Sequence, residues 1–374
     1  MNPQKGAVAA NGVNGARASA RPLRVVAIGG GTGLSTLLKG LKSYVVPPGA
    51  AEAASPHLIG ELCAVVTVSD DGGSSGRLRK ELNMLPPGDI RNCIVALSED
   101  EALLSRLFQH RFRQGSGLEG HSFGNLFLAA LTSITGDFAE AVKLSAEILL
   151  TRGHIFPATT SNVELEAVME DGTHVRGETR ITASKGRIKE LVLVPADVKP
   201  MPQTLEAIAA ADLITIGPGS LFTSLIPNLL VEGIPQAIIE SPAIKVYICN
   251  LMTQANESLG LTAGDHIRAL DQHAGARIFD YALVNRTPAS SDLKAKYALE
   301  GASQIVADLD SIEAMGVCPV LGDYLEEAGV ARHNNERVAR DLVDLTLQAH
   351  AEDKGHSSRI FSDPSGKRIA KSRS

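Results

Sequence analysis

Three short apolar segments of the chain each run into a glycine-rich turn, and a helix candidate follows each turn. The segments are residues 23–28, 62–68 and 213–216, and the turns after them are GGGTG (29–33), SDDGGSSG (69–76) and GPGS (217–220). This order is typical of a strand, a tight turn and a helix. A chain that repeats it is predicted to be an α/β protein with an open, mostly parallel sheet and helices on both faces.

Two stretches depart from that order. Residues 88–151 carry apolar residues at helical spacing and predict a helical segment. Residues 160–195 change to a period of two around an Asp-Gly turn, and the alternation at 174–182 and 188–194 predicts a small antiparallel β insertion. Further short apolar runs at 237–239, 246–249 and 281–284 are consistent with more parallel strands.

The length of the chain and the distribution of its charges indicate its domain organisation. The 374 residues fit one large domain, which we place at residues 23–345. Residues 1–22 carry three bases and no acid, and residues 351–374 carry six bases and three acids; we expect both to be disordered tails. Residues 23–350 then hold 27 bases against 39 acids. Such an acidic core argues against a nucleic-acid partner.

The chain offers no obvious membrane or metal signature. No apolar run approaches the roughly 18 residues that span a bilayer, and no signal peptide opens the chain, so we expect a cytoplasmic protein without a membrane span. The four cysteines are far apart and predict neither a zinc site nor a redox pair.

The three glycine turns predict a phosphate-bearing ligand. Ligands of open parallel sheets bind beyond the carboxyl ends of the strands, where glycine allows close approach and the first helical amides are free donors. The candidate phosphate-binding residues of the three turns are Gly29, Gly30, Gly31, Thr32, Gly33, Asp70, Asp71, Gly72, Gly73, Ser74, Gly217, Pro218, Gly219 and Ser220.

The turns match no standard nucleotide motif. In the G-x-G-x-x-G register the last position is Leu34 or Thr36, which disfavours a dinucleotide oxidoreductase, and no Gly-Lys-Ser/Thr follows to form a Walker A loop. No serine lies in a G-x-S-x-G elbow, so the catalytic residues stay unknown.

Asp70 and Asp71 leave two interpretations open. They could hold a divalent cation such as Mg²⁺ that bridges phosphates, or one of them could cap the helix that begins near Ser74. No cofactor is certain from the sequence.

Two further helix starts carry polar side chains. Arg91 and Asn92 follow the turn PPGD, where Arg could fork onto a phosphate or pair with Asp89 or Glu99. His121 and Asn125 open a helix after a glycine break, and His121 could contact a ligand or pack at the helix start.

Six strings of the chain closely resemble the gluconeogenesis factor family. They are VVAIGGGTGLSTLLKGLK (25–42), VVTVSDDGGSSGRLR (65–79), PPGDIRNC (86–93), HSFGNLFLAAL (121–131), ITIGPGSLFTSLIPNLL (214–230) and CNLMTQANES (249–258). That family is similar in fold to the 2-phospho-L-lactate transferases of coenzyme F420 synthesis. The resemblance covers residues 23–345 and implies a Rossmann-like, bacterial nucleotide-binding protein.

The resemblance also implies a function. It suggests a regulator that binds UDP-N-acetylglucosamine or UDP-glucose and is required for growth on gluconeogenic carbon sources and for cell shape and wall morphogenesis. Tyr297 and Arg332 resemble UDP-sugar contacts of the family; from the residues alone, Tyr297 reads as a helix packing residue and Arg332 as a surface base. Relatives suggest a homo-oligomer. The alternative is a metal-dependent transferase of the 2-phospho-L-lactate transferase type, acting on a nucleotide-activated substrate.

Overall fold

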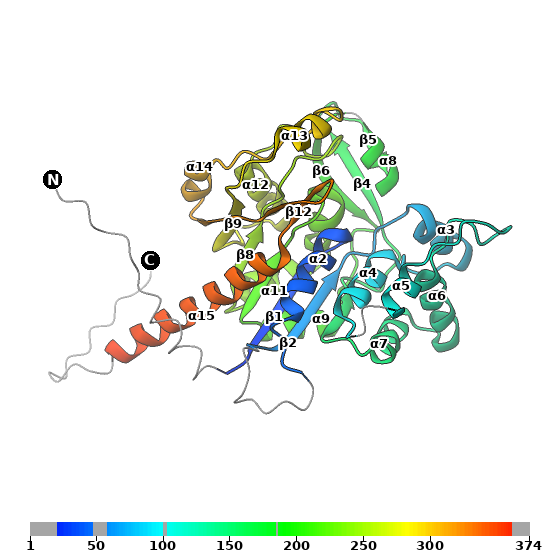
Figure 1. The fold of residues 1–374 in the computed structure, drawn as a ribbon, viewed down its shortest axis with the longest axis horizontal. Coiled ribbons are helices and arrows are strands. Elements are labelled where there is room, and N and C mark those ends of the chain that lie inside the picture. The colour runs from blue at the N-terminus through cyan, green and yellow to red at the C-terminus, as the bar shows by residue number, and fades with distance from the viewer. Residues whose placement is uncertain (1–20, 48–57, 100–102, 185, 361–374) are drawn as a thin grey trace.

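Seven parallel strands form the central sheet of the protein (Figure 1). The computed structural model describes residues 21–47, 58–99, 103–184 and 186–360. Along the sheet the order is β10-β9-β8-β7-β1-β2-β3. The strands are β1 (Leu23–Gly29), β2 (Ile59–Val66), β3 (His154–Pro157), β7 (Leu213–Ile216), β8 (Ile244–Ile248), β9 (Tyr281–Asn285) and β10 (Cys318–Gly322).

The strand order reverses direction once. From β1 the chain adds β2 and then β3 on one side, and it later adds β7 to β10 on the other side. The reversal falls between β1 and β7, which pair in parallel with Ile28 opposite Ile216. A doubly wound sheet has its ligand crevice at such a switch point, beyond the carboxyl ends of the strands. The predicted α/β architecture is therefore confirmed.

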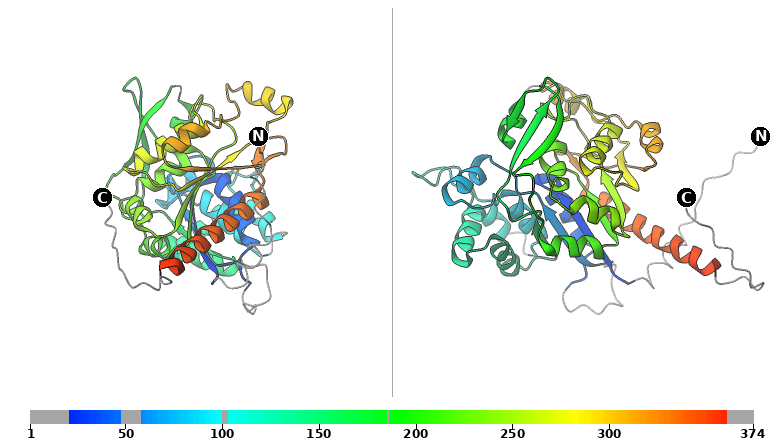
Figure 2. Two further views of the ribbon diagram at one scale, coloured as in Figure 1. Left: turned by 90° about the vertical axis from the view of Figure 1, so that its left-hand side faces the viewer. Right: turned by 180° about the vertical axis from the view of Figure 1, so that it is seen from behind.

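Helices cover both faces of this sheet. Figure 1 shows α2 and α15 in front of it, and the view from behind in Figure 2 shows the green helices that include α9 and α11 on the opposite face. The helices outside the insertion are α2 (Gly31–Lys42), α3 (Gly73–Leu82), α4 (Gly88–Leu97), α5 (Leu103–Gln109), α6 (Phe123–Thr135), α7 (Phe138–Ile148), α9 (Pro202–Ala210), the π-helix η1 (Leu221–Leu225), α10 (Ile226–Leu229), α11 (Ile234–Glu240), α12 (Ala263–Ala274), α13 (Ser291–Ala298), α14 (Leu309–Ala314) and α15 (Asn335–Ile360).

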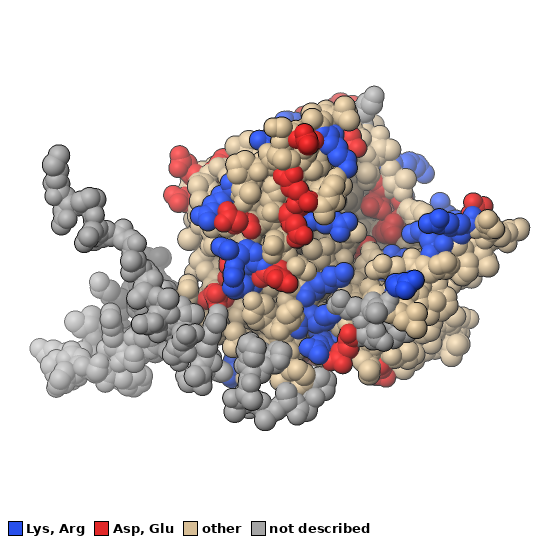
Figure 3. All heavy atoms as spheres, viewed as in Figure 1, with Lys and Arg blue, Asp and Glu red and all other residues tan. Residues whose placement is uncertain are grey.

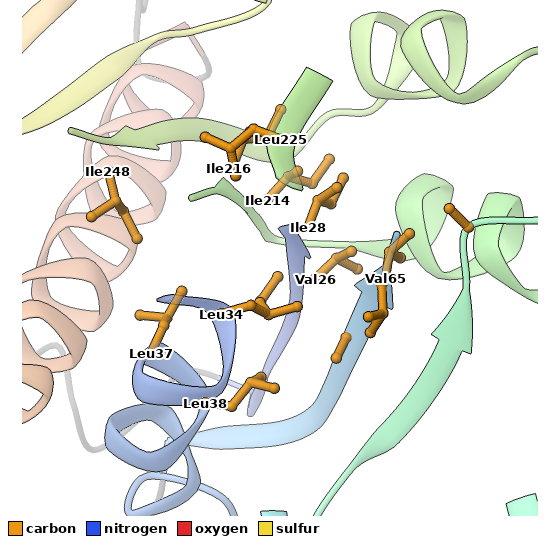
Figure 4. Packing of buried hydrophobic residues seen from close by; sticks show 14 of the residues in the cluster. Val26, Ile28, Leu34, Leu37, Leu38, Val65, Ile214, Ile216, Leu225 and Ile248 are labelled. Atoms are coloured by element: carbon orange, nitrogen blue, oxygen red, sulfur yellow. The ribbon is translucent and has the colours of Figure 1, made fainter. Parts of the chain in front are cut away.

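The core lies where α2 meets the centre of the sheet (Figure 4). Leu34, Leu37 and Leu38 of α2 are buried and project toward Val26 and Ile28 of β1. Each leucine removed from water contributes about 1.5–3 kcal/mol. Because β1 is covered on both faces, its sequence is continuously apolar from Val25 to Ile28 rather than alternating. This packing fixes the start of α2, and with it the first glycine turn.

The predicted β insertion is present as a three-stranded antiparallel sheet. Its strands are β4 (Glu164–Met169), β5 (His174–Arg176) and β6 (Ile188–Val194), in the order β5-β4-β6. The expected strand at 174–182 is wrong beyond Arg176, because helix α8 (Glu178–Ala183) follows. Gly177 has a φ of 98° and ends the strand, and the helix buries Ile181.

Three other expectations need correction. Residues 237–239 belong to helix α11 rather than to a strand, because Gly233 and Pro235 form a helix start just before them. The predicted tail at 351–374 begins inside α15, which continues to Ile360; extending an existing helix avoids the cost of nucleation. Residues 361–374 and 1–20 lie outside the described residues.

The predicted N-terminal tail also reaches too far along the chain. The Arg21 guanidinium makes a two-pronged ion pair with Asp212, at 3.0 and 2.6 Å, just before β1. Sequence composition could not reveal this partner, which is 191 positions away.

A short hairpin near the C-terminus completes the fold. Its strands are β11 (Leu325–Glu327) and β12 (Ala331–His333). Within the described ranges no single helix is long and apolar enough to cross a membrane. Among the same residues, one pair of helical segments, Leu221–Leu229 and Ile234–Glu240, has the length and apolar composition of a span when taken together, but the two are bent by 75°.

Candidate functional site

A cavity of about 520 Å³ opens at the switch point of the sheet. Its walls come from the turn after β1, the turn after β7, the segment after β8, and α8, α13 and β12. The residues of the predicted site that line it are Gly30, Gly31, Thr32, Gly33, Pro218, Gly219, Ser220 and Tyr297. We call this cavity the cleft. Its volume is in the range of small-molecule sites.

The first glycine turn brings backbone amides to the cleft. Helix α2 begins at Gly31, and its N-cap residue Gly30 makes no side-chain cap. A Cβ on Gly30 would lie 2.9 Å from a carboxylate oxygen of Asp89, and Gly31 has a φ of 62°, so both positions favour glycine. Amides in the first turn of a helix point outward and favour an anion there.

The third turn is held by amide side chains from the segment after β8. Asn250 donates to the Gly219 carbonyl at 2.7 Å and accepts from the Gly219 N–H at 3.2 Å. Gln254 donates through Nε2 to Ser220 Oγ at 2.8 Å. These bonds fix a turn that contains a cis peptide between Gly217 and Pro218.

The far wall of the cleft carries an aromatic hydroxyl and a neutral histidine. Tyr297 of α13 accepts the Ala331 N–H at 3.1 Å, which ties α13 to β12. His333 lies beside the Cys249 carbonyl at 3.0 Å, and burial lowers the pKa of this imidazole to about 4. Arg332 is exposed and is not among the lining residues, because alternate side chains of a strand point to opposite faces.

The two aspartates of the second turn have different partners. Asp70 accepts the Gly72 N–H at 2.8 Å. Asp71 instead accepts from the backbone N–H of Thr179 at 2.8 Å and from its hydroxyl at 2.5 Å, and so anchors the first turn of α8. Helix α3 has Gly72 as its N-cap without a side-chain cap, so neither aspartate caps it as the sequence allowed.

Two more carboxyl groups lie beside Asp70. Glu178 of α8 is half-buried and hydrogen-bonded to Asp70; burial and the Asp70 charge raise the pKa of Glu178 to about 8, so Glu178 keeps its proton at neutral pH. Asp89 accepts the Gly31 N–H, and its burial raises its pKa to about 6. The carboxyl groups thus connect the second turn to the first.

A buried polar network continues beyond the carboxyls. Ser74 Oγ lies 2.9 Å from His121 Nδ1, and the Asn125 amide donates to Ser74 Oγ at 3.1 Å. Arg91 donates to Ser122 Oγ at 2.6 Å, to Asn125 Oδ1 at 3.1 Å and to Asn92 Oδ1 at 2.7 Å. Burial lowers the pKa of His121, and the nearby positive charge of Arg77 lowers it further.

The predicted site residues therefore divide into two groups. The first and third turns meet around the cleft, whereas Ser74, Arg91, Asn92, His121 and Asn125 hydrogen-bond to one another beyond Asp70 and Asp89. The hydrogen-bond partners of Arg91 are neutral side-chain oxygens. Glu99, an alternative partner in the sequence, pairs with Arg152 instead. The role of the second group toward a nucleotide remains a prediction.

No cluster of three or more His, Cys, Asp and Glu side chains in the described part of the chain is arranged to hold a metal ion. Asp70 and Asp71 turn to different partners, so this pair by itself does not present two carboxylates to one point. Mg²⁺ commonly takes one or two carboxylates and completes its shell with substrate phosphates and water. Asp70 and Asp89 are the carboxylates that suit that mode.

Sequence reasoning missed several residues of the cleft. Asn250, Gln254 and Asn256 follow β8, and His333 lies on a hairpin strand. The polar run that directly follows the apolar segment 246–249 was an available signal, since strand carboxyl ends line the ligand crevice. Nothing in the local pattern around Glu178 or His333 pointed to the site.

Comparison with known proteins gives consistent results. Residues 25–325 match the family described as 2-phospho-L-lactate transferase CofD. The chain is 51% identical over 322 residues to the gluconeogenesis factor of Halalkalibacterium halodurans, an alignment that covers 86% of this chain and 95% of that protein. It is 48% identical over 324 residues to the gluconeogenesis factor of Bacillus subtilis, with 86% and 98% covered.

Solved structures agree with these relatives. A crystal structure of a protein from Bacillus halodurans superposes with a TM-score of 0.81 at 49% identity and covers 86% of this chain and 100% of that one. A second structure from the same organism, described as a member of the UPF0052 family, gives the same TM-score and identity.

Proposed function

Because the chain belongs to the 2-phospho-L-lactate transferase CofD family, we propose that it binds a nucleotide-sugar in the cleft at the switch point of its sheet. The observation that carries this proposal is the meeting of two glycine turns, at 30–33 and 218–220, around a single cavity of about 520 Å³. Neutral backbone amides at a helix start hold phosphate without a surrounding basic surface. This suits a chain whose residues 23–350 are acidic and whose face in Figure 3 shows Lys and Arg interspersed with Asp and Glu.

The ligand we favour is UDP-N-acetylglucosamine or UDP-glucose. The diphosphate would lie over the first turn of α2, and the amide side chains of Asn250, Gln254 and Asn256 would supply hydrogen bonds to the base or sugar. Tyr297 would close the far side of the cleft. Arg332 would contribute through a change of its side-chain conformation, which would bring the guanidinium from the outer face of β12 toward the phosphates.

The names of two relatives support a biological role. They are called gluconeogenesis factor and are 48–51% identical to this chain. We propose that the protein acts in the cytoplasm as a binding regulator, required for growth on gluconeogenic carbon sources and for cell shape and wall morphogenesis. Depletion in the source bacterium is expected to stop growth on glycerol while sparing growth on glucose; equal growth on both would contradict the role.

Calorimetry tests the ligand directly. Titration of UDP-N-acetylglucosamine and UDP-glucose into the full chain is expected to give saturable heat, whereas NADH gives none. Tyr297→Phe and Arg332→Ala are expected to weaken binding about threefold to tenfold, roughly the loss of one hydrogen bond. The absence of heat with either UDP-sugar up to millimolar concentration would overturn the proposal.

The second candidate is a metal-dependent transferase acting on a nucleotide-activated substrate. It is favoured by three carboxyl groups beside the first turn, those of Asp70, Asp89 and Glu178. Burial raises the pKa values of Asp89 and Glu178. Asp70 and Asp89 would hold Mg²⁺, which would neutralise phosphate charge. This candidate predicts Mg²⁺-dependent turnover that Asp70→Asn abolishes. Nucleotide binding without turnover across a panel of acceptors favours the regulator.

A further inference from the structure

A second cavity, of about 550 Å³, lies between the β insertion and helix α12. Its walls come from the start of β6, from the loop that contains Glu257, and from one side of α12. Asn256 lines both this cavity and the cleft, so the turn at 254–258 is the partition between them. We call it the α12 cavity. Its size again suits a small metabolite.

Two cations on the insertion side of the α12 cavity are unpaired. Arg187 and Lys189 are exposed lining residues, and neither side chain makes a hydrogen bond or ion pair with another residue in the part of the chain that the structure describes. The acidic lining residue Asp265 is already engaged, because it accepts from Thr262 and pairs with Arg268 at 2.6 Å. The mouth therefore carries two unpaired cations against the acid Glu170, and one further carboxyl group, Glu257, lies buried deeper in the cavity.

The floor of the α12 cavity is a buried carboxyl group. Glu257 is 8% exposed, and its Oε1 accepts the backbone N–H groups of Phe222 at 3.1 Å and Thr223 at 2.8 Å. These amides begin η1, the helix that directly follows Ser220 of the third glycine turn. Apolar lining is supplied by Phe222 and Leu259. The cavity thus combines a cationic mouth, an apolar wall and a polar floor.

The partition between the cavities contacts both sides of the cleft. Gln254 donates to Ser220 Oγ at 2.8 Å, and Asn256 donates to the Thr182 carbonyl of α8 at 3.3 Å. Glu257, three residues after Gln254 and one residue after Asn256 in the same turn, holds the start of η1. A ligand that shifts this turn therefore changes the position of both the third glycine turn and α8.

We propose that the α12 cavity binds a small metabolite bearing a phosphate or carboxylate group, and that its occupation changes the affinity of the cleft for its own ligand. The anionic group lies against Arg187 and Lys189, because a guanidinium and an ammonium at one mouth favour a doubly charged anion. The remainder of the ligand packs on Phe222 and Leu259. Coupling between the two cavities is reciprocal by linkage.

Direct binding tests the site without any nucleotide. Inorganic phosphate, glucose 6-phosphate and citrate are titrated into the full chain and into the double variant Arg187→Glu/Lys189→Glu. Saturable binding of at least one probe is expected, and the double variant is expected to weaken it by about tenfold or more because two charge-assisted contacts are lost. The matched control is Lys80→Glu/Arg113→Glu, which reverses two exposed cations elsewhere and leaves affinity within about twofold.

Two results overturn the site: no probe binds the wild-type chain below about 10 mM, or the double variant binds as tightly as the wild type. The coupling is measured as the affinity for UDP-N-acetylglucosamine with and without a saturating probe. We expect a change of about fivefold that disappears in the double variant, and an unchanged affinity contradicts the coupling. If no UDP-sugar binds at all, the proposed function fails, while the probe titrations still decide the site.

Discussion

Gly33 packs directly against the carbonyl group of Pro218, so that a Cβ on Gly33 would lie 2.2 Å from the Pro218 oxygen. The first and third glycine turns, 185 positions apart in the chain, are thus in backbone contact at the switch point. Any side chain at position 33 would separate them. The cleft exists in its present shape because glycine stands there.

Gly33→Ala is expected to open this contact. The backbone of residues 217–219 must shift, which costs about 1–3 kcal/mol of unfolding free energy, as overpacking does in other tight sites. The displaced turn should also weaken UDP-sugar binding by about tenfold or more. Urea unfolding and calorimetry measure the two effects.

The matched control is Gly29→Ala in the same turn. A Cβ on Gly29 would lie 3.5 Å from its nearest neighbour, Leu225, which is an ordinary contact. This variant should keep both stability and affinity close to the wild type. Equal losses in the two variants would show that the contact with Pro218 is not the reason for the effect.

Asn250→Ala should loosen the third turn without adding bulk. The change removes a donor to the Gly219 carbonyl and an acceptor for the Gly219 N–H. We expect a loss of about 1–2 kcal/mol in stability and a weaker nucleotide complex. Asn250→Asp keeps only the acceptor and adds a charge beside the proposed phosphate, so its affinity should be lower than that of the alanine variant. The reverse order of affinities would contradict a phosphate at this position.

Glu178→Gln tests the proton that Glu178 of α8 holds beside Asp70 of the second turn. The folded pKa of Glu178 is about 8, above its ordinary value of 4.5, so the folded state holds the proton more tightly than the unfolded chain. That stabilising contribution is complete below about pH 4.5 and is lost as the pH rises through 8. A glutamine amide donates to Asp70 at every pH and avoids the loss.

The variant should therefore gain stability relative to the wild type as the pH rises. Urea unfolding at pH 5 and at pH 8.5 is expected to show a relative gain of about 1–2 kcal/mol at the higher pH. Glu206→Gln, at an exposed position of α9, serves as the control and should show no such trend. A difference between Glu178→Gln and wild type that does not change with pH would refute a protonated Glu178 in the folded state.

Arg91→Lys should act mainly on stability. The guanidinium of Arg91 holds Ser122, Asn92 and Asn125 through separate N–H groups, a fork that an ammonium cannot reproduce. We expect a loss of about 2 kcal/mol and a melting temperature lower by about 3 °C, since the unfolding entropy of about 2.1 cal/mol/K per residue is large for a domain that spans residues 23–345. If Arg91 also contacts the nucleotide, calorimetry of the folded variant will show weaker binding; undiminished affinity would leave its role structural.

Most strands of the central sheet could be predicted from local patterns, but their order and the edge strands β3 and β10 could not. Apolar runs of β-branched residues ending in glycine placed β1, β2 and β7, and the Asp-Gly turn placed the insertion. These patterns can be recognised in short stretches of sequence. A parallel strand that is buried on both faces is apolar along its length, and a tight turn from strand to helix favours glycine. The strand prediction at 237–239 is wrong because an apolar run of three residues is too short to show either the helical or the strand periodicity. Only Pro235 indicated that helix α11 begins there.

The site was harder to predict than the sheet. The glycine-rich turns at 30–33 and 217–219 are recognisable from sequence because backbone geometry selects their glycines. Glu178 and Asn250 are not, since each acquires its role from a residue that the fold brings near: Asp70 for Glu178 and Gly219 for Asn250. Likewise, Arg91 was a candidate phosphate ligand in the sequence, but its three hydrogen-bond partners became visible only in the folded chain.

A crystal structure of the full chain with UDP-N-acetylglucosamine tests the central claim most directly. The account predicts density in the cleft, with the diphosphate within hydrogen-bond distance of the backbone N–H groups of Thr32 and Gly33 and the ligand bounded by Gly219, Asn250 and Tyr297. Ligand density at another surface of the protein, with the two glycine turns making no contact to phosphate, would contradict it.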